Sequence, residues 1–166
     1  MKRWTAIVIL GALAAVPALA AADPSDPPHD HVTGHGVLVS TSENHFAFSV
    51  HSGPQGSDPK GHVHFFDNTP RDGTPKRRFQ GDVTCLRVAG NRATFVVVFT
   101  HLKNRDGDGT VITVEDNGNP TGQTSLDRIG LSGFDGASPG CPNPALSPAN
   151  GVVTQGDIDV RDAIGG

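Results

Sequence analysis

Residues 91–118, NRATFVVVFTHLKNRDGDGTVITVEDNG, contain the longest run of strand-forming residues that follows the apolar N-terminal segment. Residues 93–101 and 110–114 are rich in β-branched and aromatic side chains, which favour strands. Between them, residues 104–109 are asparagine, arginine, aspartate and glycine, and all but the arginine are typical of tight turns. The stretch therefore predicts two strands joined by an acidic turn, and we expect the other strands to align against this pair.

Similar short segments continue along the chain. Residues 44–51 alternate between apolar Phe46, Phe48 and Val50 and polar or small side chains, which is typical of a strand with one buried face. The expected strands are residues 31–40, 44–51, 61–67, 79–88, 93–101, 110–114, 126–131 and 152–160, and the expected core includes Phe48, Phe65, Val97 and Phe99. About eight short strands with turns between them predict an all-β fold, a single antiparallel β-sandwich or partly closed β-barrel.

Composition narrows the class of protein. The 166 residues suit one domain, and the high glycine and proline counts, 21 and 13, favour turns over long helices. The formal net charge is −4, and Lys76-Arg77-Arg78 is the only basic cluster. An acidic domain of this kind is a poor candidate for binding nucleic acid.

The first residues have the three parts of a secretory signal. Lys2 and Arg3 are followed by an apolar run at residues 6–16, Pro17, and small residues suited to cleavage. The run is shorter than the ~20 residues of a spanning helix. We therefore expect a signal peptide at 1–22, a disordered lead-in at 23–30 and a β-domain at 31–162. The mature protein is expected to be secreted or extracellular, without membrane insertion.

The chain contains two cysteines. Cys85 falls in an expected strand, and Cys141 falls in a loop rich in proline and glycine. An even number of cysteines in an exported chain predicts a disulfide between them. Two unpaired buried thiols are the alternative.

Several motifs resemble those of a known family. They are Phe46 with Phe48, the segment GHVxFxD at 61–67, VTC at 83–85, AGNRA at 89–93, VEDNGNP at 114–120, DRI at 127–129 and GDIDV at 156–160. Over residues 31–162 the chain resembles the post-COAP domain family of exported bacterial proteins. The resemblance implies an extracellular all-β domain with no established activity. The proline-rich loop around Cys141 and the histidines other than His62 depart from that pattern.

The acidic turn is one candidate metal site. Asn104, Asp106 and Asp108 fall at positions 1, 3 and 5 of a calcium-loop pattern, with Glu115 at position 12. If residues 110–114 are extended, however, Glu115 lies roughly 20 Å beyond Asp108 and cannot ligate the same ion. A calcium site within the loop and an acidic turn without metal both remain open.

The histidines form a second candidate site. In a hairpin of residues 44–67, His51 is expected to face His62, with His64 on the same outer face. Imidazoles so placed bind Zn²⁺ or Cu²⁺. The alternative is a polar strand surface that faces solvent. A further, flexible candidate is His29-Asp30-His31.

No motif for a catalytic nucleophile elbow or a phosphate-binding loop is present in the sequence. We therefore expect no enzyme. The sequence favours a secreted binding or structural module with an unknown extracellular ligand or protein partner. The alternative is an extracytoplasmic metal-binding protein, for which Zn, Cu and Ca are the candidate cofactors.

Overall fold

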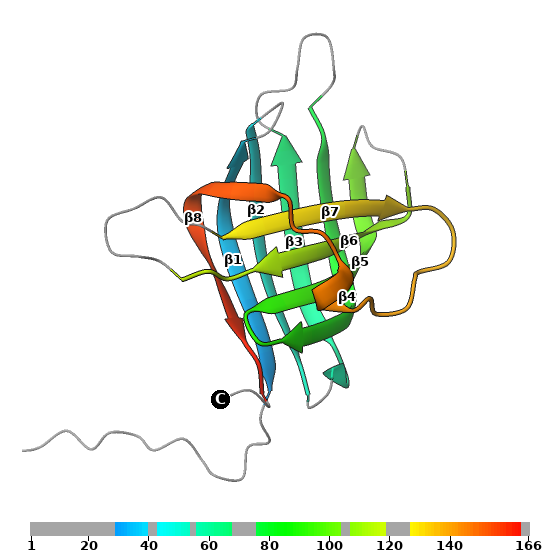
Figure 1. Cartoon of the computed structure of the whole chain (residues 1–166). Coiled ribbons are helices and arrows are strands. Elements are labelled where there is room, and N and C mark those ends of the chain that lie inside the picture. The colour runs from blue at the N-terminus through cyan, green and yellow to red at the C-terminus, as the bar shows by residue number, and fades with distance from the viewer. Residues whose placement is uncertain are drawn as a thin grey trace, which may run out of the picture.

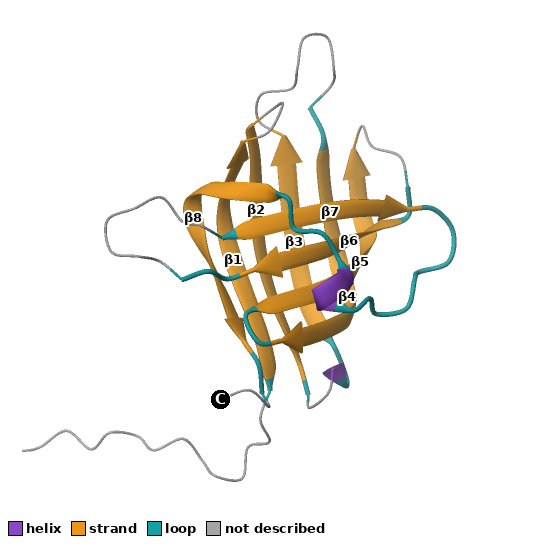
Figure 2. Cartoon of the chain, in the orientation of Figure 1, coloured by secondary structure: helices purple, strands orange, loops and turns teal. Residues whose placement is uncertain are grey.

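The computed structural model describes residues 29–39, 43–53, 56–67, 76–103, 107–118 and 127–163. In these residues eight antiparallel strands form a closed barrel (Figures 1 and 2). The strands are β1 (Asp30–Val39), β2 (Glu43–Ser52), β3 (Lys60–Asp67), β4 (Arg78–Ala89), β5 (Arg92–Lys103), β6 (Gly109–Glu115), β7 (Arg128–Phe134) and β8 (Gly151–Arg161). The expected signal peptide and most of the lead-in lie outside the described residues. No helix among those described is long and apolar enough to cross a membrane.

The strands follow one another around the barrel in chain order, and β8 pairs with β1 to close it. The all-β prediction is confirmed, and the sheet is a closed barrel rather than a sandwich or a partly closed one. Each expected strand is present. The central pair forms as predicted, with Ala93 opposite Val114 and Val97 opposite Thr110. Figure 1 shows β6 and β7 crossing in front of β1, β2 and β3.

Aromatic and aliphatic side chains fill the barrel interior. Phe48, Phe65 and Val97 are buried as predicted, and Phe99 is partly buried against the same core. Phe79 lies between Phe65 and Phe99, with ring centroids 5.0 and 4.8 Å away. Such aromatic pairs stabilise a core beyond the area that they bury.

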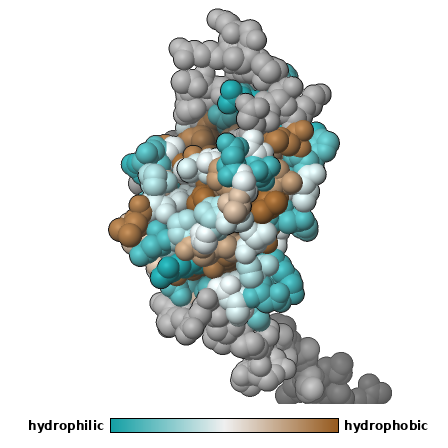
Figure 3. Space-filling model, turned by 90° about the vertical axis from the view of Figure 1, so that its right-hand side faces the viewer, coloured by the Kyte–Doolittle hydropathy of each residue, from teal (hydrophilic) through white to brown (hydrophobic). Residues whose placement is uncertain are grey.

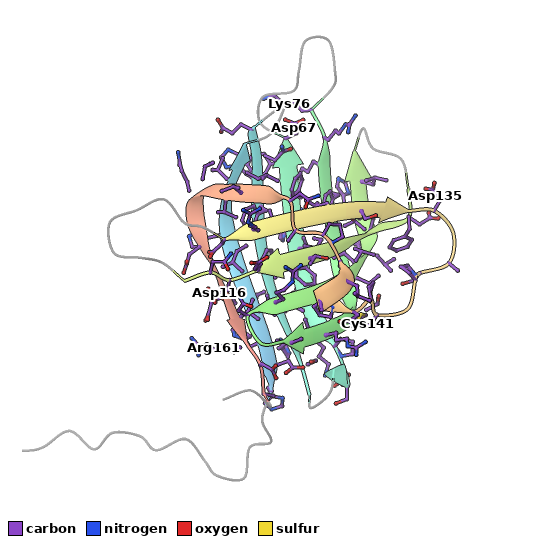
Figure 4. The ribbon with its side chains drawn as sticks, in the orientation of Figure 1. Asp67, Lys76, Asp116, Asp135, Cys141 and Arg161 are labelled. Atoms are coloured by element: carbon purple, nitrogen blue, oxygen red, sulfur yellow. A yellow bond between two sulfur atoms is a disulfide. The ribbon has the colours of Figure 1, made fainter. Side chains whose placement is uncertain are left out.

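The last strand changes neighbours along its length. β8 pairs with β7 only at Val152 and Gly151, and then turns at Gly156, whose φ of 103° suits glycine. Beyond this bend, backbone N–H groups on the edge of β8 that faces away from β1 donate hydrogen bonds to carboxylates. Asp127 accepts from the Ile158 N–H at 2.8 Å, and Asp116 accepts from the Val160 N–H at 3.1 Å. Figure 4 shows Asp116 on the side of the barrel where β8 runs.

A disulfide joins Cys85 on β4 to Cys141, with their Cα atoms 5.6 Å apart, as predicted (Figure 4). It anchors the long segment between β7 and β8. The same segment is held at a short 3₁₀ turn, η2 (Pro144–Leu146), by Arg92, which donates to the carbonyl oxygens of Pro144 and Ser147. On the side of the molecule seen in Figure 3, hydrophilic residues are interspersed with small apolar areas.

Candidate binding groove on the outer face

The outer surface of β1, β2 and β3 carries most of the histidines. Side chains alternate along a strand, so the buried Phe46, Phe48 and Val50 leave the residues between them outside. On β3 the buried Val63 and Phe65 likewise leave the residues between and beside them on the outer face. The outward side chains include His35 on β1, His45 and His51 on β2, and His62 and His64 on β3, and the predicted histidine face is therefore present.

Strand pairing arranges these side chains in rows that cross four strands. One row contains Asp157, His35, Ala47 and His64, and the next contains Asp159, Thr33, Ser49 and His62. One hollow follows these two rows, and an adjoining hollow extends along the strands to His45 and Phe66. The two hollows share His35, Ala47 and His64. We call this combined hollow the outer groove.

The groove owes its shape to the sizes of its side chains. The outside of a barrel is convex, so it is hollowed only where small residues lie between larger ones. Here Ala47 and Ser49 on β2 and Thr33 on β1 form the floor, together with the larger His35 on β1. Histidines of β3 form one wall and aspartates of β8 form the other. With neighbouring strands about 4.8 Å apart, the distance from wall to wall is about 14 Å.

Carboxylates orient two of the imidazoles. His62 Nδ1 lies 2.8 Å from Asp82 Oδ1, and His45 Nε2 lies 2.7 Å from Glu43 Oε1. A neutral imidazole donates through one nitrogen and accepts through the other. His45 also stacks on Phe66, with ring centroids 4.7 Å apart and planes 8° apart. These contacts fix which nitrogen of each ring is left for another molecule.

The aspartate wall lies in a negative field. Burial raises the pKa of Asp157 above its ordinary value, and the carboxylates of Asp127, Asp116 and Asp159 raise it further, while His35 acts in the opposite direction. A titratable residue that lies in a hollow, and whose pKa is shifted by burial and by neighbouring charges, is a candidate functional residue. The wall would be stabilised by a hydrogen-bond donor or a positive charge from a ligand.

The histidine register differs from the prediction. His51 lies opposite Lys60, and His62 lies opposite Ser49, so the expected His51–His62 pair is wrong by two residues. A Cβ on Gly61 would overlap the Ser49 carbonyl oxygen, so this close approach requires glycine there. A shift of two residues leaves every side chain on the same face, so alternation cannot detect it.

The changed register separates the predicted ligands. His51 is displaced along the strands from His62, and farther from His64. In the part of the chain that the structure describes, no three His, Cys, Asp or Glu side chains are grouped so that they could hold an ion. The expected three-histidine site of His51, His62 and His64 is therefore not assembled.

Of the acidic turn, Asn104 and Asp106 lie outside the described residues. Asp108 accepts a hydrogen bond from the Gly136 N–H at 2.7 Å, and therefore ties this turn to the segment after β7. Glu115, at the far end of β6, pairs with Arg92 at 2.7 Å. A calcium site and an acidic turn without metal therefore both stay predictions.

Comparison with known proteins adds no relative. The chain matches no family model, no curated protein and no solved structure. The resemblance to the post-COAP domain family stays a prediction.

Proposed function

We propose that this protein is a secreted binding module that holds an extracellular polysaccharide in the outer groove. The observation that carries the proposal is the pair of rows that cross β8, β1, β2 and β3. They place hydroxyl, imidazole and carboxylate groups on the floor and the two walls of the groove. Sugars offer many hydroxyl groups, each of which donates and accepts hydrogen bonds.

The form of the groove supports a chain-like polar ligand. Pockets for small apolar molecules are enclosed and lined mostly by hydrophobic side chains. The interior of this barrel is instead filled by its own core, and the groove lies on the outside. An elongated polar ligand would lie across the strands and meet both walls.

The compartment expected from the sequence supports the same proposal. The leader directs the chain to export, and the Cys85–Cys141 disulfide suits an oxidising environment. Extracellular and cell-wall polysaccharides are the polymers that such a module would meet.

The test compares polysaccharide binding by the purified mature protein and by a variant with a filled groove. Affinity electrophoresis in gels with different soluble polysaccharides, with EDTA present, measures binding without metal. Ala47→Arg places a long side chain on the floor, and is expected to abolish retardation. Ala145→Arg, at an exposed alanine of η2, is the matched control and is expected to bind like the wild type. Equal binding by the two variants, or no retardation of the wild type by any polysaccharide, would refute the proposal.

A further inference from the structure

We propose that His62 and His64 form a transition-metal site on the β3 wall of the groove, and that Asp82 positions His62 for it. The site does not depend on polysaccharide binding. It takes one Zn²⁺ or Cu²⁺ ion, because imidazole nitrogen is a preferred ligand of both metals.

His62 and His64 are spaced so that both can reach one ion. They are two residues apart on one strand, so both side chains project from the same outer face. At about 3.3 Å per residue, their backbone positions are about 6.6 Å apart. Two imidazole rings that lean toward each other across this distance can share one ion, with nitrogen-to-metal distances of about 2.0–2.1 Å.

The contact between His62 and Asp82 orients the imidazole ring of His62. Nδ1 of His62 donates to Oδ1 of Asp82 at 2.8 Å, so Nε2 carries the free lone pair. A metal-binding histidine commonly donates its other ring N–H to a carboxylate, which fixes its tautomer and orientation. The side chain of His62 is 79% exposed, so Nε2 is accessible to an ion from solution.

A second pair of histidines lies nearby and is less suited to a cation. His31 and His51 face each other across β1 and β2. Their outer neighbours in the same row are Arg161 on β8 and Lys60 on β3. Each of these cations is paired with a carboxylate, Arg161 with Asp159 and Lys60 with Asp58. The carboxylate of Asp82, in contrast, contacts the imidazole of His62 directly.

The chemistry of the site follows from its number of ligands. In the described residues no third His, Cys, Asp or Glu completes the group, so that part of the chain supplies two ligands. The other coordination positions are left for water or for a donor atom of a bound molecule. Such a site is expected to exchange its ion readily, unlike a closed structural zinc site.

Isothermal titration of the mature protein with ZnCl₂ and, separately, CuCl₂ tests the site. We expect one ion per chain. The double variant His62→Ala/His64→Ala is expected to lose this binding, and the matched variant His31→Ala/His51→Ala is expected to keep it. Circular dichroism and a melting curve show that each variant is folded. No binding by the wild type, or binding that survives in the first variant or disappears in the second, would overturn the proposal.

The role of Asp82 has its own test. Asp82→Ala is expected to weaken metal binding by about 10- to 100-fold, the usual effect of losing such a partner. Asp82→Asn keeps an oxygen that accepts from Nδ1 and is expected to recover most of the affinity. If Asp82→Ala binds like the wild type, or if both variants are equally weak, Asp82 does not position His62.

Discussion

Asp127 accepts a hydrogen bond from the backbone N–H of Ile158 at 2.8 Å, across 31 residues of sequence. Its other carboxylate oxygen accepts from the Asn117 N–H at 3.0 Å, so one buried side chain connects the segment after β6 to β8. β7 pairs with β8 over only two positions. The carboxylate therefore takes the place of a neighbouring strand where the barrel closes.

Replacing Asp127 by alanine is expected to lower the free energy of unfolding by about 3 kcal/mol, because two backbone donors lose a charged acceptor in a buried position. Urea denaturation followed by circular dichroism measures the change. Asp135→Ala, at an exposed position after β7, is the control and is expected to change stability little. Similar stability of the two variants would contradict the role given to Asp127.

Reduction of the disulfide is expected to destabilise the fold. Cys85 and Cys141 are 56 residues apart, and closing a loop of that length contributes about 4 kcal/mol in the chain-entropy model. The Cys85→Ser/Cys141→Ser variant should therefore unfold at lower urea concentration than the wild type. Thiol alkylation before and after reduction gives an independent check, and two reactive thiols in the native exported protein would disprove the bridge.

Two phenylalanines distinguish the inside of the barrel from the outside. Phe79 is fully buried between other rings, whereas Phe66 is 42% exposed beside His45. Phe79→Ala is expected to lower stability by about 3–5 kcal/mol because it leaves a cavity. Phe66→Ala is expected to cost about 1 kcal/mol or less. Equal losses in thermal or urea unfolding would show that the two faces are assigned incorrectly.

Asp157 predicts a dependence of stability on pH. Its pKa is raised in the folded state, first by burial and then by Asp127, Asp116 and Asp159. Folding therefore favours the protonated carboxyl group of Asp157. The contribution of this group to the free energy of unfolding is fully present below its pKa in the unfolded chain, and it is lost as the pH rises through its pKa in the folded protein. Asp157→Asn is expected to raise the melting temperature at pH 7, and the gain should disappear near pH 3. A gain independent of pH would contradict this account.

On β2 and β3, alternation in the sequence predicts which side chains are buried. Apolar residues at every second position place Phe48 and Phe65 inside and His62 and His64 outside. Alternation is not sufficient on β5, where residues 93–97 are all buried. It could not predict the register of His51, because a shift of two residues preserves both faces.

The aspartate wall of the groove could not be predicted from local patterns. Asp157 lies beside His35 only because β8 returns to pair with β1 at the end of the chain. The hydrogen bonds from β8 to Asp116 and Asp127 likewise depend on the closed barrel. Such contacts join residues that are far apart in sequence, and turn and strand propensities contain no information about them.

Chemical-shift mapping shows directly whether the outer groove binds a polysaccharide. The ¹⁵N-labelled mature protein is titrated with soluble oligosaccharide fragments of extracellular and cell-wall polysaccharides, with EDTA present. If the groove binds the fragments, shift changes will be concentrated around Thr33, His35, Ala47, Ser49 and Asp157, on the adjacent strands β8, β1 and β2. Changes confined to η2 or to the segment around Cys141, or no changes with any fragment, would contradict it.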